Sequence, residues 1–264
     1  EDKTGQDKDY TVLARAMCNR HTGIGADGLI VIVDSRVADV RMRIINSDGS
    51  EAEMCGNGIR CFAKYVYDSG IIEKKQFTVE TPAGIMEPEI TVGADNKAEL
   101  ITINMGRPSF NRSEIPMEGT DGRVLNEDLG VDGENWKITS LLMGVPHTVT
   151  YVDDVDSVDI EKIGPLFEKH EAFPKHTNIN FAQQMDDRTV KVRTWERGAG
   201  ATLACGTGSC SVAVASFLNG RTGREVDIQL PLGTLHIEYR EEDGNVYMTG
   251  PAAVSFTGTW PDET

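Results

Sequence analysis

Two cysteines of this chain lie in nearly identical glycine-rich segments. Cys55 begins the tetrapeptide Cys-Gly-Asn-Gly, and Cys205 begins Cys-Gly-Thr-Gly 150 residues later. Apolar residues at helical spacing follow both tetrapeptides, so each thiol is predicted to lie just before the N-terminus of a helix. Unpaired backbone N–H groups and the helix dipole favour negative charge there. Such a position lowers the pKa of a nearby thiol and can also bind a substrate carboxylate.

A pair of thiols on opposite sides of one carbon atom could invert a stereocentre. One thiolate would remove the α-proton from one face of a bound amino acid, and the other thiol would protonate the opposite face. The helix ends would stabilise the charge that develops on the carboxylate in the transition state. The pair therefore indicates a 1,1-proton transfer, catalysed by a racemase or epimerase that needs no cofactor.

Other interpretations of the cysteines remain open. Free cysteine is often buried in the core, which is the interpretation we favour for Cys18, Cys61 and Cys210. The spacings from Cys55 to Cys61 and from Cys205 to Cys210 are wider than usual for hairpin zinc ligands, so we expect no metal site. A non-catalytic redox or metal-binding cysteine protein is the remote alternative.

The elements around the cysteines indicate a duplication. Pro82 and Pro231 lie in similar apolar segments 149 residues apart, close to the spacing of the two cysteines. Two similar units would bring the two helix starts to a cleft, a common ligand site. We predict an N-terminal domain over residues 1–106, rejoined by 251–264, and a C-terminal domain over 107–250.

The hydrophobic pattern predicts the fold class. Residues 9–20 show helical spacing, 29–33 form an apolar strand, and 40–45 and much of 76–105 alternate with period two. Many short strands with few long helices predict an α+β fold with mostly antiparallel pairing.

Composition excludes several classes of protein. The 264 residues carry a formal net charge of −16, which argues against nucleic acid and anionic membranes as partners. No apolar run approaches the roughly 18 residues of a membrane helix. Five cysteines are an odd number in a long chain, so a reducing compartment is expected rather than a disulfide framework.

Several segments together resemble the diaminopimelate epimerase family. They extend over nearly the whole chain, and their order is far more specific than any one of them. They are residues 19–27 (Asn-Arg-His-Thr-Gly-Ile-Gly-Ala-Asp), 46–50 (Asn-Ser-Asp-Gly-Ser), 54–61 (Met-Cys-Gly-Asn-Gly-Ile-Arg-Cys), 196–200 (Glu-Arg-Gly-Ala-Gly) and 204–210 (Ala-Cys-Gly-Thr-Gly-Ser-Cys).

The resemblance implies two pseudo-symmetric domains, each a mostly antiparallel sheet rolled around a central helix. It implies interconversion of LL- and meso-2,6-diaminopimelate in lysine and peptidoglycan precursor biosynthesis, without pyridoxal phosphate, by a cytoplasmic homodimer. Cys55 and Cys205 match the two catalytic thiols. His147 and Glu196 match residues that help to set thiol protonation, and Glu196 also belongs to the substrate site.

The resemblance further assigns residues to the two ends of the substrate. Asn46, Asn178 and Arg197 match the family residues that hold the distal amino-acid end. The turns Gly56-Asn57 and Gly206-Thr207 match those that bind the reacting carboxylate. One departure is Val145, where the family often has asparagine before Pro-His. The nearest rival is a racemase of the same fold acting on proline or hydroxyproline, but the distal-end residues favour a long, doubly charged amino acid.

Overall fold

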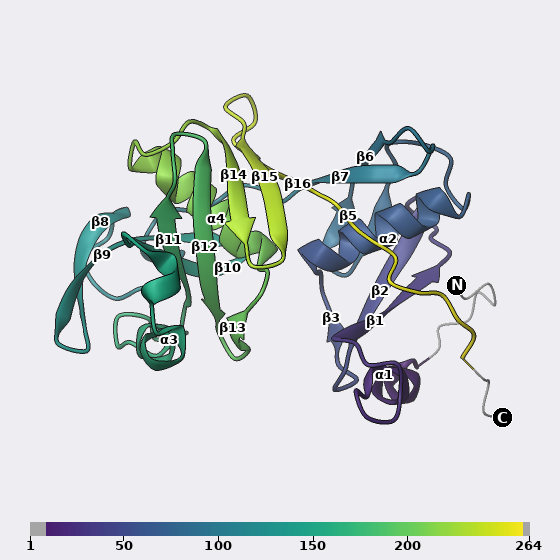
Figure 1. Ribbon diagram of the computed structural model, residues 1–264, viewed down its shortest axis with the longest axis horizontal. Helices are drawn as coiled ribbons and strands as arrows, with labels where there is room; N and C mark the ends of the chain where they lie inside the picture. Colours follow the sequence, from purple (N-terminus) through teal and green to yellow (C-terminus); the bar gives the residue numbers. More distant parts are fainter. Residues whose placement is uncertain (1–8, 261–264) are drawn as a thin grey trace. The chain divides into compact units, whose positions relative to one another are not determined.

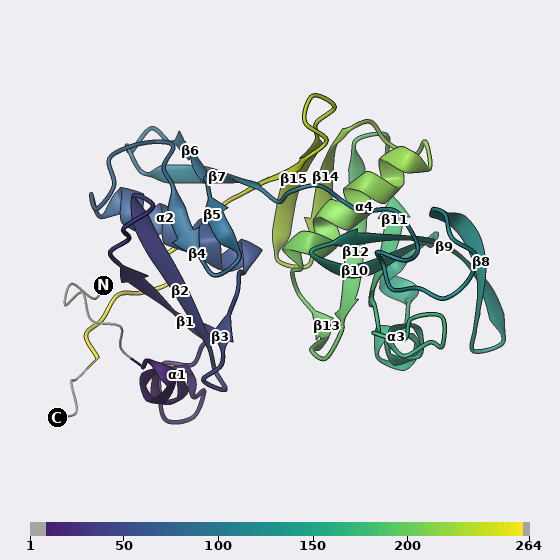
Figure 2. The ribbon, with the colours of Figure 1, turned by 180° about the vertical axis from the view of Figure 1, so that it is seen from behind.

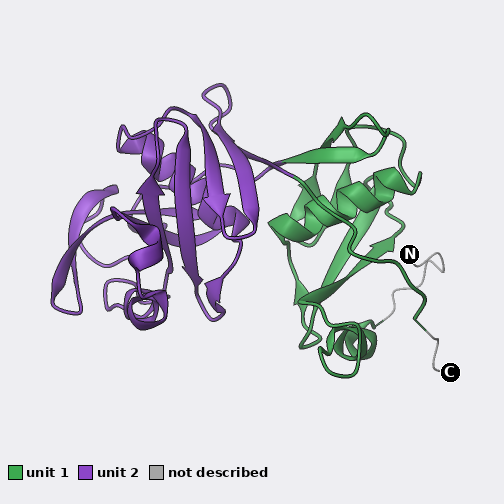
Figure 3. Cartoon of the chain, viewed as in Figure 1, with its two compact units in different colours: residues 1–102, 251–264 green, residues 103–250 purple. Residues whose placement is uncertain are grey.

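The computed structural model describes residues 9–260, which divide into two compact units. Unit 1 comprises residues 1–102 and 251–264, and unit 2 comprises residues 103–250 (Figure 3). Short strands dominate both units and four α-helices accompany them in the described part of the chain, which confirms the predicted α+β class. No helix among residues 9–260 is long and apolar enough to cross a membrane.

Unit 1 is a small sheet with two helices (Figure 1). Its elements are α1 (Thr11–Cys18), β1 (Gly28–Val33), β2 (Val40–Asn46), β3 (Glu51–Ala52), α2 (Gly56–Asp68), β4 (Val79–Thr81), β5 (Gly84–Met86), β6 (Glu89–Val92) and β7 (Ala98–Asn104), within which the chain passes into unit 2. β2 pairs antiparallel with β1 and β3 and parallel with β4, and β5 pairs antiparallel with β4. α2 buries Ile59, Phe62, Ala63 and Val66.

The first helix is shorter than its predicted range of 9–20. The Asp9 carboxylate accepts a hydrogen bond from the Thr11 backbone N–H at 2.8 Å, which ties down the first turn. At the other end, the Asn19 side chain accepts from the backbone N–H groups of His21 and Thr22, so the chain turns instead of continuing the helix.

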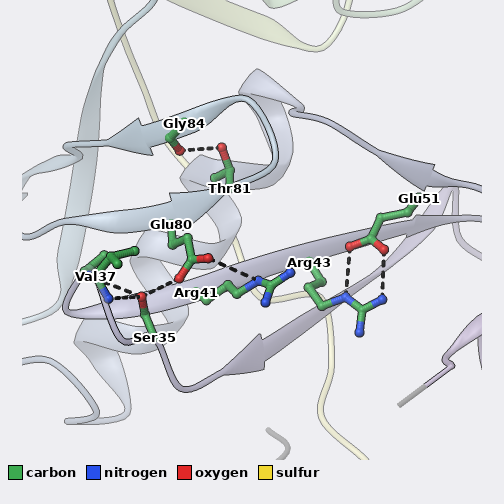
Figure 4. Close-up of polar contacts among 9 residues, drawn as sticks. Ser35, Val37, Arg41, Arg43, Glu51, Glu80, Thr81 and Gly84 are labelled. Atoms are coloured by element: carbon green, nitrogen blue, oxygen red, sulfur yellow. Dashed lines mark hydrogen bonds and ion pairs between the residues drawn. The ribbon is translucent and has the colours of Figure 1, made fainter. Parts of the chain in front are cut away.

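Charged side chains link neighbouring strands of the unit 1 sheet (Figure 4). Arg43 on β2 makes a two-armed ion pair with Glu51 on β3, with both N–O distances 2.8 Å. On β4, the Glu80 carboxylate accepts a hydrogen bond from Ser35 and lies 3.8 Å from Arg41. These contacts hold β3 and β4 on β2.

Unit 2 is a larger sheet that curves around one buried helix (Figure 2). Its elements are β8 (Val124–Val131), β9 (Glu134–Met143), β10 (Val145–Tyr151), the 3₁₀ turn Val155–Ser157, α3 (Ile160–Glu168), β11 (Asn178–Gln184), β12 (Thr189–Glu196), β13 (Gly200–Thr202), α4 (Gly206–Leu218), β14 (Glu225–Leu230), β15 (Gly233–Tyr239) and β16 (Val246–Gly250). α4 is apolar on most sides, and every residue from Gly208 to Ser216 is buried.

The two units repeat the same order of elements and pairings. β1 to β5 with α2 correspond to β11 to β15 with α4, and both helices occupy positions 150 residues apart. The register is the same, since Ile30 pairs with Ile44 in unit 1 and Asn180 pairs with Thr194 in unit 2. Both hairpins turn on a Pro-X pair, at Pro82 and Pro231. The duplication inferred from the cysteines and prolines is thus present in the topology of each unit.

Candidate active site

Cys55 is the N-cap residue of α2. Its backbone is extended, with φ −143° and ψ 117°, and its Sγ accepts a hydrogen bond from the Gly58 backbone N–H at 3.4 Å. The side chain is exposed. A sulfur in the N-cap position takes the place of the usual serine or aspartate oxygen and accepts one of the N–H groups of the first helical turn.

Cys205 has the same local geometry at the start of α4. Its φ is −124° and its ψ 111°, and its Sγ accepts from the Gly208 backbone N–H at 3.4 Å. Oγ1 of Thr207 lies 3.6 Å from the same sulfur. Unlike Cys55, this residue is buried, with 5% of its surface exposed. The two thiols therefore share a cap geometry and differ in their access to solvent.

The interpretation of Cys61 as a core residue is wrong. Its side chain is exposed on α2, as is that of Tyr65 one turn later. The buried face of α2 carries Ile59 and Phe62 instead. Cys18 and Cys210 are buried, as predicted. Within residues 9–260, no group of three or more histidine, cysteine or acidic side chains is arranged to hold a metal ion.

A polar cluster lies beside Cys205 because three neighbouring strands present alternate residues to α4. His147 comes from β10, Asn178 and Asn180 from β11, and Thr194 and Glu196 from β12. β10 runs parallel to β11 with His147 opposite Asn178, and β12 runs antiparallel with Thr194 opposite Asn180. Side chains two residues apart on a strand point to the same face, so these five share one surface.

His147 is fully buried and has polar neighbours at both ring nitrogens. Its Nε2 lies 3.1 Å from Oγ1 of Thr207 and 3.4 Å from Nδ2 of Asn178, and its Nδ1 lies 3.3 Å from Nδ2 of Asn180. Burial lowers the pKa of His147 to about 3, and the positive charge of Arg197 adds to this decrease. The imidazole is therefore neutral at physiological pH.

The pKa of His147 predicts a pH-dependent stability. The folded pKa of about 3 is below the ordinary 6.5, so the unfolded chain takes up the proton first as the pH falls. The associated stability is complete above pH 6.5 and is lost as the pH drops toward 3. Between pH 7 and 5 we expect the wild type to lose about 2 kcal/mol more unfolding free energy than His147→Gln. Urea unfolding followed by circular dichroism at both pH values measures this difference, and an equal loss in both proteins would contradict it.

The Cys205 thiol is held in its protonated form. Burial raises its pKa to about 12, and the Glu196 carboxylate beside it adds to the increase. Hydrogen bonds from Thr207 and from the Gly208 backbone N–H act in the opposite direction. Glu196 is itself fixed by the Thr202 hydroxyl, which donates to its Oε1 at 2.6 Å. Cys205 is thus prepared to act as a proton donor.

The loop after β12 carries Arg197 and is anchored on two sides. The Arg197 backbone N–H donates to Oδ1 of Asn178 at 2.7 Å, and its guanidinium donates to the Lys175 carbonyl. The buried carboxylate of Glu168, at the end of α3, accepts from the Trp195 indole N–H at 2.7 Å and from the Gly198 backbone N–H at 3.2 Å. α3 therefore positions the segment that bears Glu196 and Arg197.

In unit 1 the predicted site residues lie at the ends of β2 and α2. Asn46 ends β2 and donates from Nδ2 to Ser50 Oγ at 3.0 Å, within the predicted turn. Asn57 lies in the first turn of α2, where its Oδ1 accepts from the Arg60 guanidinium at 3.0 Å. Arg60 also donates to the Gly56 carbonyl at 3.2 Å. This buried arginine fixes the Gly56-Asn57 turn next to Cys55.

Comparison with known proteins identifies the family. The family model of diaminopimelate epimerase matches residues 1–111 and 139–255. The diaminopimelate epimerase of Pelotomaculum thermopropionicum is 51% identical over 257 residues, covering 97% of this chain and 91% of that protein. The chain belongs to the diaminopimelate epimerase family. It is accordingly an isomerase, as the chemistry of the paired cysteines predicts.

A second relative and a solved structure also match most of the chain. The diaminopimelate epimerase of Heliobacterium modesticaldum is 50% identical over 254 residues, covering 96% of this chain and 90% of that protein. A crystal structure of a probable proline racemase from Agrobacterium radiobacter K84, with bound carbonate, matches 98% of this chain and 84% of that chain with a TM-score of 0.64 and 17% identity. At that identity the likeness shows a shared fold. The predicted diaminopimelate epimerase type of fold is confirmed.

The structure distributes the predicted site residues over the two units. Unit 1 contains Cys55, Gly56, Asn57 and Asn46, and unit 2 contains Cys205, Gly206, Thr207, His147, Asn178, Glu196 and Arg197. The sequence interpretation missed Asn180, Thr194, Arg60 and Glu168. Asn180 follows Asn178 by two residues in an alternating strand, so the strand period alone could have placed it on the same face.

Proposed function

We propose that this protein interconverts LL-2,6-diaminopimelate and meso-2,6-diaminopimelate. The α-proton would be removed by one thiolate and replaced on the opposite face by the other thiol. The observation that carries the proposal is the repeated N-cap cysteine, Cys55 on α2 and Cys205 on α4, each accepting a backbone N–H at 3.4 Å. Family membership at about half identity supports the substrate.

The proton balance of the proposed reaction closes on the two sulfurs. In one direction Cys55 is the thiolate that takes the Cα proton, and Cys205 is the thiol that delivers one. Afterwards their states are exchanged, and the return reaction restores them. Because Glu196 and burial favour the protonated form of Cys205, it enters this cycle as the acid. The reaction is redox-neutral, and the electron pair left on Cα can be delocalised into the adjacent carboxylate, so we propose that it proceeds without pyridoxal phosphate or metal.

The reacting carboxylate is proposed to bind at the first turns of α2 and α4. The first N–H groups of a helix lack intrahelical acceptors, and those of Gly56-Asn57 and Gly206-Thr207 occupy these positions. Charge that develops on this carboxylate during proton removal would be stabilised there.

The distal end of the substrate is assigned to Asn46, Asn178 and Arg197. Arg197 is exposed and can bind a second carboxylate in a two-armed contact. Asn178 is buried and carries both a donor and an acceptor, which suits a neighbouring ammonium and carboxylate. A proline-sized ring has no second charged end, so these residues favour diaminopimelate over proline or hydroxyproline.

The biological setting is proposed from the family. We assign the protein to the cytoplasm, as a homodimer, in the supply of meso-diaminopimelate for lysine and peptidoglycan precursor synthesis. Sedimentation velocity of the purified chain would measure its oligomeric state.

The direct test is solvent exchange at the substrate α-carbon. Purified protein is incubated with LL-diaminopimelate in D₂O without added cofactor, and the products are resolved by chiral chromatography and mass spectrometry. We expect meso-diaminopimelate with one deuterium at the inverted carbon. Absence of both inversion and deuterium uptake, with L-proline and hydroxyproline as comparison substrates, would overturn the proposal.

A further inference from the structure

Asn180 is a fully buried carboxamide to which the proposed function gives no role. Its neighbours determine which end of the amide is which. Nδ2 donates to the Thr148 carbonyl at 3.0 Å, and a carbonyl can only accept. Oδ1 accepts from the Thr194 hydroxyl at 3.0 Å. The amide is thus held at both ends, and the second N–H of Nδ2 is directed at Nδ1 of His147, 3.3 Å away.

This orientation selects one tautomer of His147. Because Asn180 presents a donor to Nδ1, that nitrogen must carry the lone pair, and the ring proton lies on Nε2. The nearer neighbour of Nε2 is Oγ1 of Thr207 at 3.1 Å, which can accept this proton. The other neighbour is Nδ2 of Asn178 at 3.4 Å, whose Oδ1 is occupied by the Arg197 N–H. That nitrogen is itself a donor, so the Nε2–H points to Thr207.

The series of hydrogen bonds that starts at Asn180 continues to the sulfur of Cys205. Thr207 has one hydroxyl proton, and its oxygen already accepts from His147. Its proton is then available to the Sγ of Cys205, 3.6 Å away. The hydrogen bonds run from Asn180 through His147 and Thr207 to Cys205, all with the donor on the Asn180 side. A sulfur that receives a hydrogen bond is stabilised as the thiolate.

The other unit shows that the fold does not need a polar residue here. Under the 150-residue repeat, Asn180 and Thr194 correspond to Ile30 and Ile44, which pair with each other in the same register. In unit 1 these isoleucines approach Gly58, and in unit 2 Asn180 approaches Gly208. An apolar pair therefore satisfies the packing at this position, and the carboxamide and hydroxyl of unit 2 call for another explanation.

We propose that Asn180 is a positioning residue that holds His147 as the Nε2–H tautomer, so that Thr207 donates its hydrogen bond to Cys205. This role rests on the proposed function in one respect, that Cys205 is a catalytic thiol. The tautomer itself is independent of any substrate. An acceptor in place of the Asn180 N–H would put the ring proton on Nδ1. Thr207 would then donate to Nε2, and Sγ of Cys205 would lose its hydrogen bond from Thr207.

The tautomer can be measured directly by long-range ¹H–¹⁵N NMR of the histidine rings. The His147 signals are assigned by their loss in His147→Gln. We expect the wild type to show the neutral Nε2–H form from pH 5 to 8, and Asn180→Asp to show a protonated Nδ1. An Nδ1–H tautomer in the folded wild type would overturn the proposal, whether or not the protein epimerises diaminopimelate.

Kinetics give the second readout. In Asn180→Asp we expect kcat to fall by about 10²-fold while KM changes less than about threefold, since the substrate contacts remain. The pH profile of kcat should gain an ionisation between pH 5 and 8, because a carboxylate at Nδ1 favours the imidazolium. The other charged or titratable groups around this ring are Arg197 and, beyond Thr207, Cys205 and Glu196, which the substitution leaves in place.

Two further variants separate positioning from folding. Asn219→Asp is the matched control, because the Asn219 carboxamide in unit 2 likewise bonds one hydroxyl and one backbone carbonyl, donating to those of Thr139 and Ala215, away from His147. It should leave tautomer and pH profile unchanged. If Asn180→Asp does not fold, the double variant Asn180→Ile with Thr194→Ile copies the packing of unit 1. A folded double variant with wild-type kcat and pH profile would contradict the proposal.

Discussion

Serine in place of Cys55 or of Cys205 is expected to reduce epimerisation at least about 10³-fold. A hydroxyl is a far weaker acid than a thiol, so it donates a proton poorly and almost none of it is ionised to act as a base. Each variant should nevertheless retain proton exchange on one face of Cα, and the two variants should differ in which face this is. Each retains one thiol, which can remove a proton from one face of Cα and return a solvent deuteron to that same face. One variant should therefore exchange the α-hydrogen of the L centre, and the other that of the D centre, both with retention of configuration.

Chiral analysis of deuterium uptake from LL- and meso-diaminopimelate measures this split. Cys61→Ser is the matched control, since Cys61 is also a thiol on α2 but is exposed and six residues beyond the cap position. It should epimerise at the wild-type rate. Inversion by either cap variant at more than a few per cent of the wild-type rate, or exchange of the same centre by both, would exclude a two-thiol mechanism.

The sequence predicts the fold because local signals and the duplication agree. A cysteine followed by Gly-x-Gly and an apolar run predicts a helix start, and both α2 and α4 begin at the residue after the cysteine. Period-two alternation predicts β2 over 40–45, one residue short of its end at Asn46, and it predicts strand structure within 76–105, where β7 lies. These signals depend on neighbouring residues alone, so they can be recognised without tertiary information.

The elements that the sequence does not predict depend on contacts between distant segments. α3 contains Gly164 and Pro165, which normally weaken a helix. In the folded chain Gly164 lies under the Trp195 ring, where a Cβ would come within 2.6 Å of ring carbons, so glycine is required by packing across thirty residues. Nothing near α3 in the sequence indicates this partner.

The same reasoning separates the predicted from the missed site residues. Cys55, Cys205 and the two Gly-x turns carry a motif that is visible in the sequence. The role proposed for Asn180 arises only because β10, β11 and β12 are neighbours in the sheet of unit 2, where His147 pairs with Asn178 and Asn180 with Thr194 although these residues are distant in the sequence. The prediction for Cys61 fails because a place within a helix does not show which face is buried. The buried face of α2 carries Ile59, Phe62 and Val66, and Cys61 lies outside it.

Alanine at Gly208 is expected to lower the rate of epimerisation about 10²-fold, the scale of a misplacement near 1 Å at a reacting group. A Cβ there would lie 2.6 Å from Oδ1 of Asn180 and 3.2 Å from Sγ of Cys205. Both atoms are buried and hydrogen bonded, so neither can move without breaking a bond to Thr194 or to the helix cap. Alanine would otherwise favour the helix by about 1 kcal/mol, so a loss of activity here has a steric cause.

Gly58→Ala is the matched control, because Gly58 occupies the same position after Cys55. Its Cβ would meet Cδ1 of Ile30 at 3.3 Å and Cδ1 of Ile44 at 3.5 Å, contacts that small shifts of these flexible ends relieve. It would also lie 3.3 Å from Cβ of Cys55, whereas at Gly208 the added Cβ meets the cysteine sulfur as well. We expect this variant to keep its rate within about threefold of the wild type, and steady-state kinetics with LL-diaminopimelate compare the two. Equal losses in both variants would mean that the helix cap alone is sensitive to a methyl group. A loss confined to Gly208→Ala locates the constraint in the buried polar cluster that only unit 2 possesses within residues 9–260.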